Sequence, residues 1–324
     1  MIGFLIRRLA NYVVLCLVAT FLAFALASTT FDPVAVLEQR NPPPPAAVLD
    51  AKRAALHLDE PVPRRFLTWV GGVARGDFGQ TVAERPVVDE LPRRVGVSLR
   101  LFLVGVVLGV VFGVLLGVVS AIRQHKLSDH LATLVSFIVL STPVFVLGTL
   151  LKQPAQSFNE VIGANYLQTL GESTPGFEGG WFASLGDRLR YSIVPTATIA
   201  LGQIAFYSRY QRSAMLDVLG SDFLRTARAK GLTRRRALVK HGLRTALIPM
   251  ATLFAFGFGL LVTGGTFTER IFGWYGMGDW LVVGVASQDA NIVATVTLFI
   301  AVLVLVSGWL SDVLYAALDP RVRI

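Results

Sequence analysis

Long apolar stretches constrain the fold of this chain more than any other feature. A helix needs roughly 20 apolar residues to cross a hydrocarbon core of about 30 Å. Five stretches reach that length: Leu9–Ser28, Val95–Ile122, Leu131–Leu151, Thr245–Thr266 and Asn291–Leu314. A sixth, Tyr191–Tyr210, is less apolar because it contains Gln203 and Arg209, and such a helix is expected to face other helices or a water-filled path. The pattern predicts an all-α integral membrane protein with six transmembrane helices.

Composition supports this class. Hydrophobic residues make up 53% of the chain and charged residues 16%, whereas a soluble domain carries about 25% charged residues. Disorder is excluded, because it needs low hydrophobicity and high charge. The single cysteine, Cys16, excludes an intrachain disulfide framework, and no Cys/His cluster has the spacing of a zinc site. We therefore expect this chain to bind no metal and no cofactor.

The first apolar stretch could instead be a cleavable signal peptide, because Arg7 and Arg8 precede it and it ends in small residues. Its length of about 20 residues exceeds the usual signal core of about 7 to 15, which favours a retained helix. We therefore predict a first transmembrane helix over 1–28, an external, periplasmic segment over 29–94, and a core with the other five helices over 95–324.

Basic residues predict the orientation, because short loops rich in Lys and Arg stay on the cytoplasmic side. With six spans, four basic segments fall on one side, so both termini are predicted to be cytoplasmic. The third of these segments, 214–244, holds eight Lys and Arg residues against Asp217 and Asp222 alone. The basic residues of the four segments are Arg7 and Arg8; Arg123, His125 and Lys126; Arg225, Arg228, Lys230, Arg234, Arg235, Arg236, Lys240 and Arg244; and Arg321 and Arg323.

Three segments are then external: 29–94, 152–190 and 267–288. The first contains a proline run over 41–45, which favours an extended spacer, followed by a stretch with helical spacing over 46–58. The last is too apolar for a solvated loop and too rich in glycine for a span. We interpret it as a re-entrant or interfacial segment, which other parts of the protein must cover.

Glycines and a proline mark two places where helices could approach closely or bend. Four glycines recur every fourth residue in the second span, so that another backbone can pack against them or slide along them during transport. The proline of Ser141-Thr142-Pro143 removes a backbone hydrogen bond and predicts a kink in the third span, which could also act as a hinge. The residues concerned are Gly105, Gly109, Gly113, Gly117 and Pro143.

Polar residues in the sixth stretch, Gln203, Tyr207 and Ser208, are candidates for lining a translocation path. Hydrogen bonding between helices explains Gln203 equally well, and Arg209 and Tyr210 are typical anchors at the membrane interface.

The most informative cytoplasmic stretch runs from Leu219 to Pro249. Ser221 or Asp222 can cap a helix over Phe223–Lys230, and Gly231 suits the left-handed residue that ends it. Its apolar face is formed by Phe223, Leu224 and Ala227.

Thr233 then caps a second helix whose first turn is Arg234-Arg235-Arg236. Cations at that position oppose the helix dipole, so these arginines serve something other than helix stability. They could anchor the topology, or form a surface where a cytosolic partner receives the first helix in a groove. The patch is too short, and too close to the membrane, to favour nucleic-acid binding.

Arg225-Thr226-Ala227-Arg228-Ala229-Lys230-Gly231 resembles the EAA loop of bacterial ABC importer permeases, in the form found in the dipeptide/oligopeptide (OppB/DppB) group. Ala227 and Gly231 match that loop, whereas Arg244 replaces its later proline. The other matching motifs are Arg7-Arg8-Leu9, Phe66-Leu67-Thr68-Trp69, Gly76-Asp77-Phe78-Gly79, Ser141-Thr142-Pro143, Arg209-Tyr210-x-Arg212-Ser213, Glu269-x-x-Phe272 with Gly276-Met277-Gly278, and Leu318-Asp319-Pro320-Arg321. The stretch 152–186 does not align clearly with this group.

The resemblance implies a non-catalytic permease of the bacterial inner membrane that imports peptides, with nickel complexes or heme as alternative cargo. It implies as partners a homologous second permease, two cytosolic ATPase domains that bind ATP and Mg²⁺, an external substrate-binding protein and the lipid bilayer, and no nucleic acid. It also implies that the EAA region contacts the ATPase, through Asp222, Phe223, Leu224, Arg225, Thr226, Ala227, Arg228 and Gly231.

An enzyme has little support in these residues. The chain lacks the Gly-x-x-x-x-Gly-Lys-Ser/Thr phosphate loop, and no Ser/His/Asp set or pair of membrane carboxylates is apparent. An ATP-independent channel or secondary transporter would need inverted repeats or buried ionisable residues, neither of which is evident. A structural scaffold without transport leaves the capped cytoplasmic helix unexplained.

Overall fold

The computed structural model describes residues 2–38 and 44–318, and its side chains are described except at 2–8, 36, 255–264 and 315–318. Within this part the regular structure is helical apart from one isolated bridge between Gln80 and Pro86. Residues 41–43 of the proline run and 319–324 of the predicted basic tail lie outside the described residues. Pro45, at the end of that run, is extended (φ −57°, ψ 147°), as predicted.

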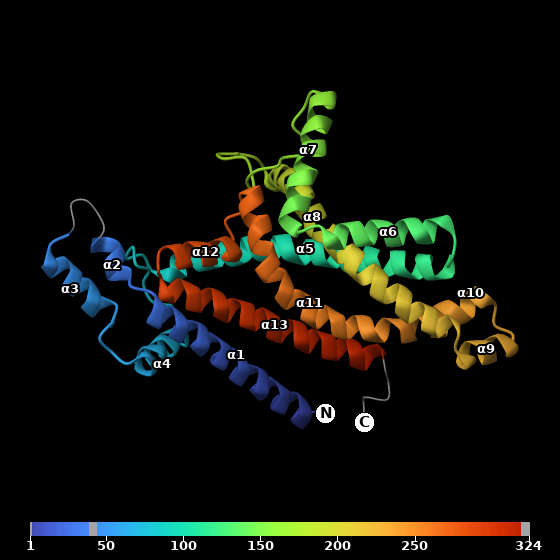
Figure 1. Ribbon diagram of the computed structural model, residues 1–324, viewed down its shortest axis with the longest axis horizontal. Helices are drawn as coiled ribbons and strands as arrows, with labels where there is room; N and C mark the ends of the chain where they lie inside the picture. Colours follow the sequence, from blue (N-terminus) through green and yellow to red (C-terminus); the bar gives the residue numbers. More distant parts are fainter. Residues whose placement is uncertain (1, 39–43, 319–324) are drawn as a thin grey trace. The chain divides into compact units, whose positions relative to one another are not determined.

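Thirteen α-helices and one π-helical turn, η1, are described (Figure 1). Their order is α1 (Ile2–Thr30), α2 (Pro33–Glu38), α3 (Ala46–Ala55), α4 (Val62–Val73), α5 (Val87–Ile122), α6 (Leu127–Ser141), α7 (Val144–Ile162), α8 (Trp181–Leu219), α9 (Asp222–Ala229), α10 (Arg234–Ala237), η1 (Leu238–Gly242), α11 (Leu243–Phe272), α12 (Met277–Ala286) and α13 (Ala290–Leu318).

All six predicted spans lie on helices, and the third is interrupted. Three described stretches are long and apolar enough to cross a bilayer by themselves: Leu9–Thr30, Val87–Ile122 and Ala290–Leu314. The pair α6 and α7 is a fourth if its two halves count as one crossing. The predicted span 191–210 lies within α8, and the predicted span 245–266 lies within α11.

The third span contains a complete break rather than the predicted kink. Helix α6 ends at Ser141, Thr142 is extended, and α7 starts after Pro143 at an angle of 112° to α6. Proline explains the break, because it cannot donate a backbone hydrogen bond and forces the preceding residue out of the helical region. The hydroxyl of Thr142 donates to the Ile138 carbonyl (2.8 Å) and so satisfies one of the freed carbonyls.

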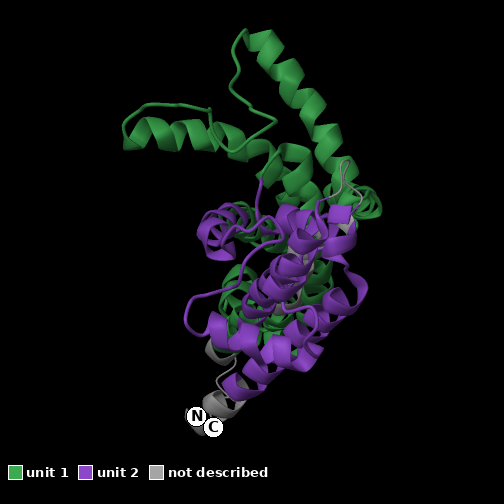
Figure 2. Ribbon diagram, turned by 90° about the vertical axis from the view of Figure 1, so that its left-hand side faces the viewer, with its two compact units in different colours: residues 1, 99–274, 306–324 green, residues 2–98, 275–305 purple. Residues whose placement is uncertain are grey.

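The chain divides into two compact units, coloured separately in Figure 2. The first unit comprises Leu99–Trp274 and Val306–Ile324, with Met1, and the second comprises Ile2–Ser98 and Tyr275–Leu305.

Helix α8 is the centre of the first unit, where it packs against α6, α7 and α11. It also lies against the glycine stripe of α5. A Cβ atom added at Gly109 would lie 2.3 Å from the Cβ of Gln203, and one added at Gly113 would lie 2.8 Å from the Cβ of Tyr207. Because both numbers rise together along the two helices, α5 and α8 run parallel. The four glycines therefore let the backbone of α8 approach α5 more closely than any side chain would allow.

The second unit holds the predicted external segment 29–94. The predicted helix over 46–58 is present as α3, although it ends at Ala55. Phe66 and Trp69 of α4 pack with Phe24 of α1 and Ala294 of α13. The indole N–H of Trp69 donates to the Phe78 carbonyl (3.1 Å), so two sequence motifs that are separate in the chain meet in one apolar cluster.

The prediction of an irregular segment starting at Phe267 is wrong for its first residues. Helix α11 continues to Phe272 and ends at Gly273, whose φ is +65°. Thr268, Glu269 and Phe272 are buried, and neither glycine nor proline occurs in 267–272. The interruption is confined to 273–276, and the rest of the predicted segment forms the short apolar helix α12.

The close approach of α5 and α8 can be tested by substitution. Gly109→Ala places a methyl group where Gln203 already lies, so we expect the unfolding temperature in detergent to fall, for a cost of about 1–3 kcal/mol. Gly202→Ala is the matched control, because a Cβ at Gly202 of α8 meets nothing within 4 Å and alanine favours a helix. Equal unfolding temperatures for the two variants would contradict the close approach of α5 and α8.

Candidate coupling site and translocation path

Helix α9 lies where a helix over Phe223–Lys230 is predicted, shifted by one residue to Asp222–Ala229. Gly231 follows it with a φ of +90°, as predicted, and this conformation favours glycine because it has no Cβ. The predicted cap is different at the start. Ser221 occupies the cap position, but its hydroxyl donates to the Val218 carbonyl (2.6 Å) instead of accepting from α9.

Of the predicted apolar face of α9, Leu224 is buried within the chain and Ala227 is half-buried, whereas Phe223 is exposed. Leu224 is only 6% exposed and packs in a cluster with residues of α5, α8, α10, η1 and α11. That cluster comprises Ala121, Met215, Val218, Leu224, Ala237, Leu238 and Ala246. Burial against the rest of the chain stabilises this face, because each buried leucine removes apolar area from water. Leu224 thus attaches α9 to the rest of the chain.

The rest of α9 is exposed and mostly polar. Asp222, Phe223, Arg225, Thr226 and Arg228 are all exposed, with Phe223 at 44% as the one large apolar side chain among them. A face with one aromatic side chain among charged groups is a typical protein-binding surface.

A basic surface adjoins α9. Thr233 caps α10 by accepting a hydrogen bond from the Arg236 N–H (3.4 Å), as predicted. Arg234, Arg235 and Arg236 are exposed. Among the described groups no ion pair is seen for Arg228, Arg234, Arg235 or Arg236, so these side chains are available to a partner. Arg225 approaches Asp222 (3.3 Å).

The π-helical turn η1 follows, and the sequence did not predict it. Gly242, its last residue, lies against the side chains of Val218 and Leu224, so that a Cβ there would come within 3.2 Å of Val218. Such turns add a residue to a helix and recur at functional sites. Here the turn lets α10 continue into α11 while Gly242 leaves room for Leu224.

A buried ion pair next to this region also escaped sequence analysis. The guanidinium of Arg212 in α8 donates to both carboxylate oxygens of Asp129 at 2.7 and 2.8 Å. Asp129 is 1% exposed, and it also accepts from the Ser120 hydroxyl and from the His125 backbone N–H. Arg212 belongs to a motif quoted above, but nothing in the sequence pairs it with Asp129.

The candidate path residues are enclosed in the first unit. Tyr207 is fully buried and faces Gly113, and Ser208 lies 3.2 Å from the Ser136 hydroxyl. The Tyr207 hydroxyl and the side-chain amide of Gln211 have no hydrogen-bond partner among the described residues. Buried polar groups without partners are costly, so water or a polar ligand would stabilise them if α5 and α8 separated.

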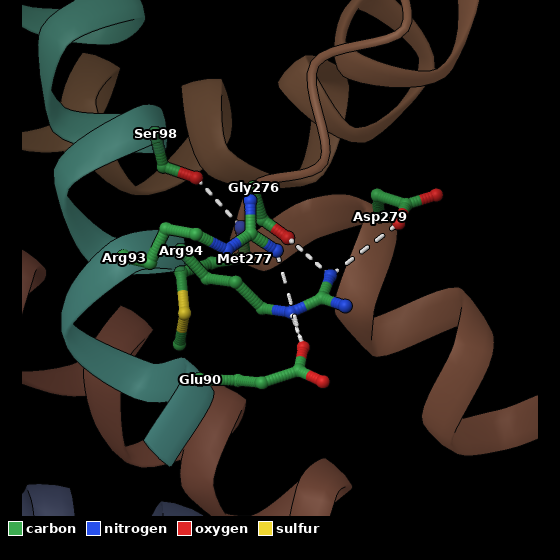
Figure 3. A network of polar contacts seen from close by, with 7 residues as sticks. All are labelled: Glu90, Arg93, Arg94, Ser98, Gly276, Met277 and Asp279. Atoms are coloured by element: carbon green, nitrogen blue, oxygen red, sulfur yellow. Dashed lines mark hydrogen bonds and ion pairs between the residues drawn. The ribbon is translucent and has the colours of Figure 1, made fainter. Parts of the chain in front are cut away.

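In the second unit, a network of polar contacts joins the start of α5 to the start of α12 (Figure 3). The guanidinium of Arg94 donates to Glu90 (2.6 Å), to the Gly276 carbonyl (3.4 Å) and to Asp279 (3.5 Å), and it lies over the Trp280 ring. The Ser98 hydroxyl accepts from the Met277 N–H (2.7 Å), which satisfies one of the free donors at the N-terminus of α12. This network fixes the Gly276-Met277-Gly278 motif.

A cavity of about 760 Å³ also lies in the second unit, beside α3, α4 and residues 288–291. Two of the charged groups on its wall have partners within the chain: Lys52 bonds to Glu84 (2.9 Å), and Asp289 accepts from the N–H groups of Val82 and Ile292. These charges therefore stabilise the walls of the cavity and do not point to a ligand.

The loop between α7 and α8, in the stretch that aligns poorly, is held by specific contacts. The Asp187 carboxylate accepts from the backbone N–H of Thr174 (2.8 Å) and from its hydroxyl (2.6 Å). These hydrogen bonds lower the pKa of Asp187 below its ordinary value. At the other end of the loop, the Gly171 N–H donates to the Phe272 carbonyl (2.8 Å) at the end of α11.

The described part of the chain is helical and contains stretches long and apolar enough to cross a bilayer, which defines the class of a helical membrane protein. The sequence matches the family model of the binding-protein-dependent transport system inner membrane component over residues 113–324, and the chain belongs to this family.

Relatives cover the whole chain. It is 56% identical over 324 residues to the oligopeptide transport system permease protein OppB of Mycobacterium tuberculosis (strain ATCC 25618 / H37Rv), with both chains fully covered. It is 33% identical over 326 residues to the oligopeptide transport system permease protein AppB of Bacillus subtilis (strain 168), again with full coverage. It is 31% identical over 326 residues to the glutathione transport system permease protein GsiC of Escherichia coli (strain K12), covering all of this chain and 99% of GsiC.

The Thr174–Asp187 contact predicts a pH dependence. Because the pKa of Asp187 is lower in the folded state than in the unfolded state, the contact stabilises the fold above about pH 4 and is lost as the pH falls further. Thr174→Val should lower the unfolding temperature at pH 6, and the difference from the parent protein should narrow toward pH 3. Asp187→Asn is the control, since it removes the titrating carboxylate and with it this pH dependence. If the difference in unfolding temperature between Thr174→Val and the parent protein stays constant with pH, the assignment is contradicted.

Proposed function

We propose that this chain is the permease subunit of an ATP-driven importer of peptides in the bacterial cytoplasmic membrane, where it forms half of the translocation path. The observation that carries the proposal is the exposed helix α9, ended by Gly231 and attached through Leu224 to the helical core. Relatives named as oligopeptide permeases match over the full chain, which supports peptides as cargo.

We further propose six spans with both termini on the cytoplasmic side. The parallel course of α5 and α8 supports this topology, because six spans require the second and fourth to run in the same direction. Helices α6 and α8 are antiparallel, since Asp129 meets Arg212 and Ser136 meets Ser208. The C-terminal ends of α5 and α8 therefore lie together in the first unit. These ends lead into the basic segments 123–126 and 214–244.

The partners follow from the family's dependence on a binding protein. We propose a second, homologous permease subunit, two cytosolic ATPase domains that bind ATP and Mg²⁺, and an external substrate-binding protein. The exposed face of α9 and the arginines of α10 would meet the ATPase. The permease itself supplies binding surfaces and movement, and ATP hydrolysis belongs to the partner subunits.

Transport then proceeds by alternating access. Closure of the ATPase domains displaces α9, and the displacement favours one access state only if the ATPase contacts differ between the two states. Separation of α5 from α8 in one state would expose Gln203, Tyr207 and Gln211 to a polar path. Their amide and hydroxyl groups suit a peptide backbone, which offers hydrogen-bond donors and acceptors at regular intervals.

Co-expression with the partner subunits tests the function directly. The purified complex, reconstituted in proteoliposomes with its binding protein and a labelled peptide library, should take up peptide only when ATP is supplied. A permease that does not co-purify with the ATPase subunits, or that passes peptide without ATP, would overturn the proposal in favour of a channel.

The topology is tested by cysteine labelling, for which the chain is well suited because Cys16 is its single cysteine. In a Cys16→Ser background, Arg228→Cys in α9 should react with a membrane-impermeant maleimide in inside-out vesicles and not in intact cells. Glu178→Cys, in the exposed loop between α7 and α8, is the matched control and should show the reverse pattern. Labelling of both positions from the same side would contradict the proposed orientation.

The role of the α9 end is tested at Gly231. A β-branched residue with a φ of +90° is strained by about 1–3 kcal/mol, so Gly231→Val should distort the turn that follows α9. We expect ATP hydrolysis to continue while peptide uptake falls roughly tenfold, the equivalent of about 1.4 kcal/mol. Gly220→Val is the control, because Gly220 has an ordinary φ of −84°. Normal uptake by the Gly231 variant would show that the turn has no part in coupling.

A further inference from the structure

The Asp129–Arg212 ion pair joins three elements of the first unit, and its role in transport rests on the proposed function. Three elements meet at one carboxylate: the end of α5 through the Ser120 hydroxyl, the α5–α6 connection through the His125 N–H, and α8 through both guanidinium nitrogens of Arg212. All the acceptor sites of the carboxylate face donors. The pair is costly to break, because removing either partner leaves an uncompensated charge.

The pair lies next to the attachment of α9. Leu224 of α9 packs against Met215 and Val218, which belong to α8. The connection between the two helices is short and tied back to α8, since the N–H groups of Gly220 and Ser221 donate to the carbonyls of Leu216 and Val218. A displacement of α9 must therefore displace the end of α8 that carries Arg212.

Helix α6 is bound to the same face of α8 at three places. Besides the ion pair, the hydroxyls of Ser136 and Ser208 lie 3.2 Å apart, and the Arg209 guanidinium lies 4.2 Å from the centre of the Phe137 ring. Of these contacts, only the ion pair joins two charged groups, and its Asp129 side is buried whereas Arg212 is 28% exposed. At its other end, α6 is separated from α7 by the break at Thr142 and Pro143, so the two are not one continuous helix.

We propose that the Asp129–Arg212 pair is a positioning element that makes α6 move with α8 when the ATPase displaces α9. The pair contacts neither substrate nor ATPase in this account. It converts a movement of the coupling helix into a movement of α6, whose Ser136 hydroxyl lies 3.2 Å from that of the candidate path residue Ser208. Without the pair, α6 no longer moves with α8, and ATP hydrolysis is no longer coupled to a change of access to the path.

The experiment measures peptide uptake and ATP hydrolysis in the same proteoliposomes, using the complete complex with its binding protein and a labelled peptide. The double variant Asp129→Asn with Arg212→Gln is the main test, because it removes both charges together and leaves no unpaired charge in the interior. We expect it to co-purify with the ATPase and to hydrolyse ATP at the parent rate. The peptide taken up per ATP should fall roughly fivefold or more, in the range of measured coupling energies.

Two further variants separate positioning from simple stability. Arg212→Lys keeps the charge but not the paired geometry. Its peptide uptake per ATP should lie between that of the double variant and that of the parent complex. Glu172→Gln is the matched control, because it removes the Arg100–Glu172 ion pair (2.8 Å) from the same unit and should leave uptake per ATP unchanged.

The outcomes distinguish this inference from the proposed function. If the double variant assembles and transports with the parent ratio of peptide to ATP, the pair is structural only and the inference is overturned. An equal fall in uptake per ATP in the Glu172→Gln variant would also overturn it, since the loss of any ion pair in the unit would then reduce coupling. If the parent complex itself shows no ATP-dependent uptake, the proposed function fails, whatever the variants do.

Discussion

The close approach of α5 and α8 is the constraint on which the first unit depends. In an apolar environment no hydrophobic force draws helices together, so association relies on dispersion and on polar contacts at short range. Gly109 and Gly113 allow the two backbones to come near enough for dispersion and for polar contacts. Helix α8, held in this way, then contacts α6, α7 and α11. Its end also carries α9, so the same packing that builds the unit positions the candidate coupling site.

Polar residues are concentrated at the ends of the helices, where they fasten separate segments. Asp129 joins α5, α6 and α8, and Arg94 joins the start of α5 to α12. These contacts are costly to break, because the charges involved are shielded from water. The middle of α8 is different: Tyr207 and Gln211 are buried with polar groups that lack partners. A helix interface that is well packed but poorly satisfied in hydrogen bonds is suited to opening, which agrees with a transporter that alternates between states.

Sequence reasoning succeeded where a local rule applies. The positions of α9 and α10 followed from the left-handed conformation of Gly231 and the capping hydroxyl of Thr233, both of which depend on a few neighbouring residues. It failed where contacts are distant. The apolar side chain of Leu224 indicated a face for a partner, whereas the structure buries that side chain against α8 and α11. A pattern of apolar residues shows that a face will be covered, but not by what.

By itself, the sequence determined the helical membrane class, because stretches of about 20 apolar residues leave few alternatives in a bilayer. It also determined that the helix is disturbed at Pro143 and that α9 ends at Gly231, since proline and left-handed glycine act on their own backbone, whereas the complete break was seen only in the structure. Only the tertiary structure decided that Asp129 pairs with Arg212, that the glycine stripe faces Gln203 and Tyr207, and that Leu224 points inward. Each of these is a choice among partners far apart in the chain, and packing geometry rather than local preference makes that choice.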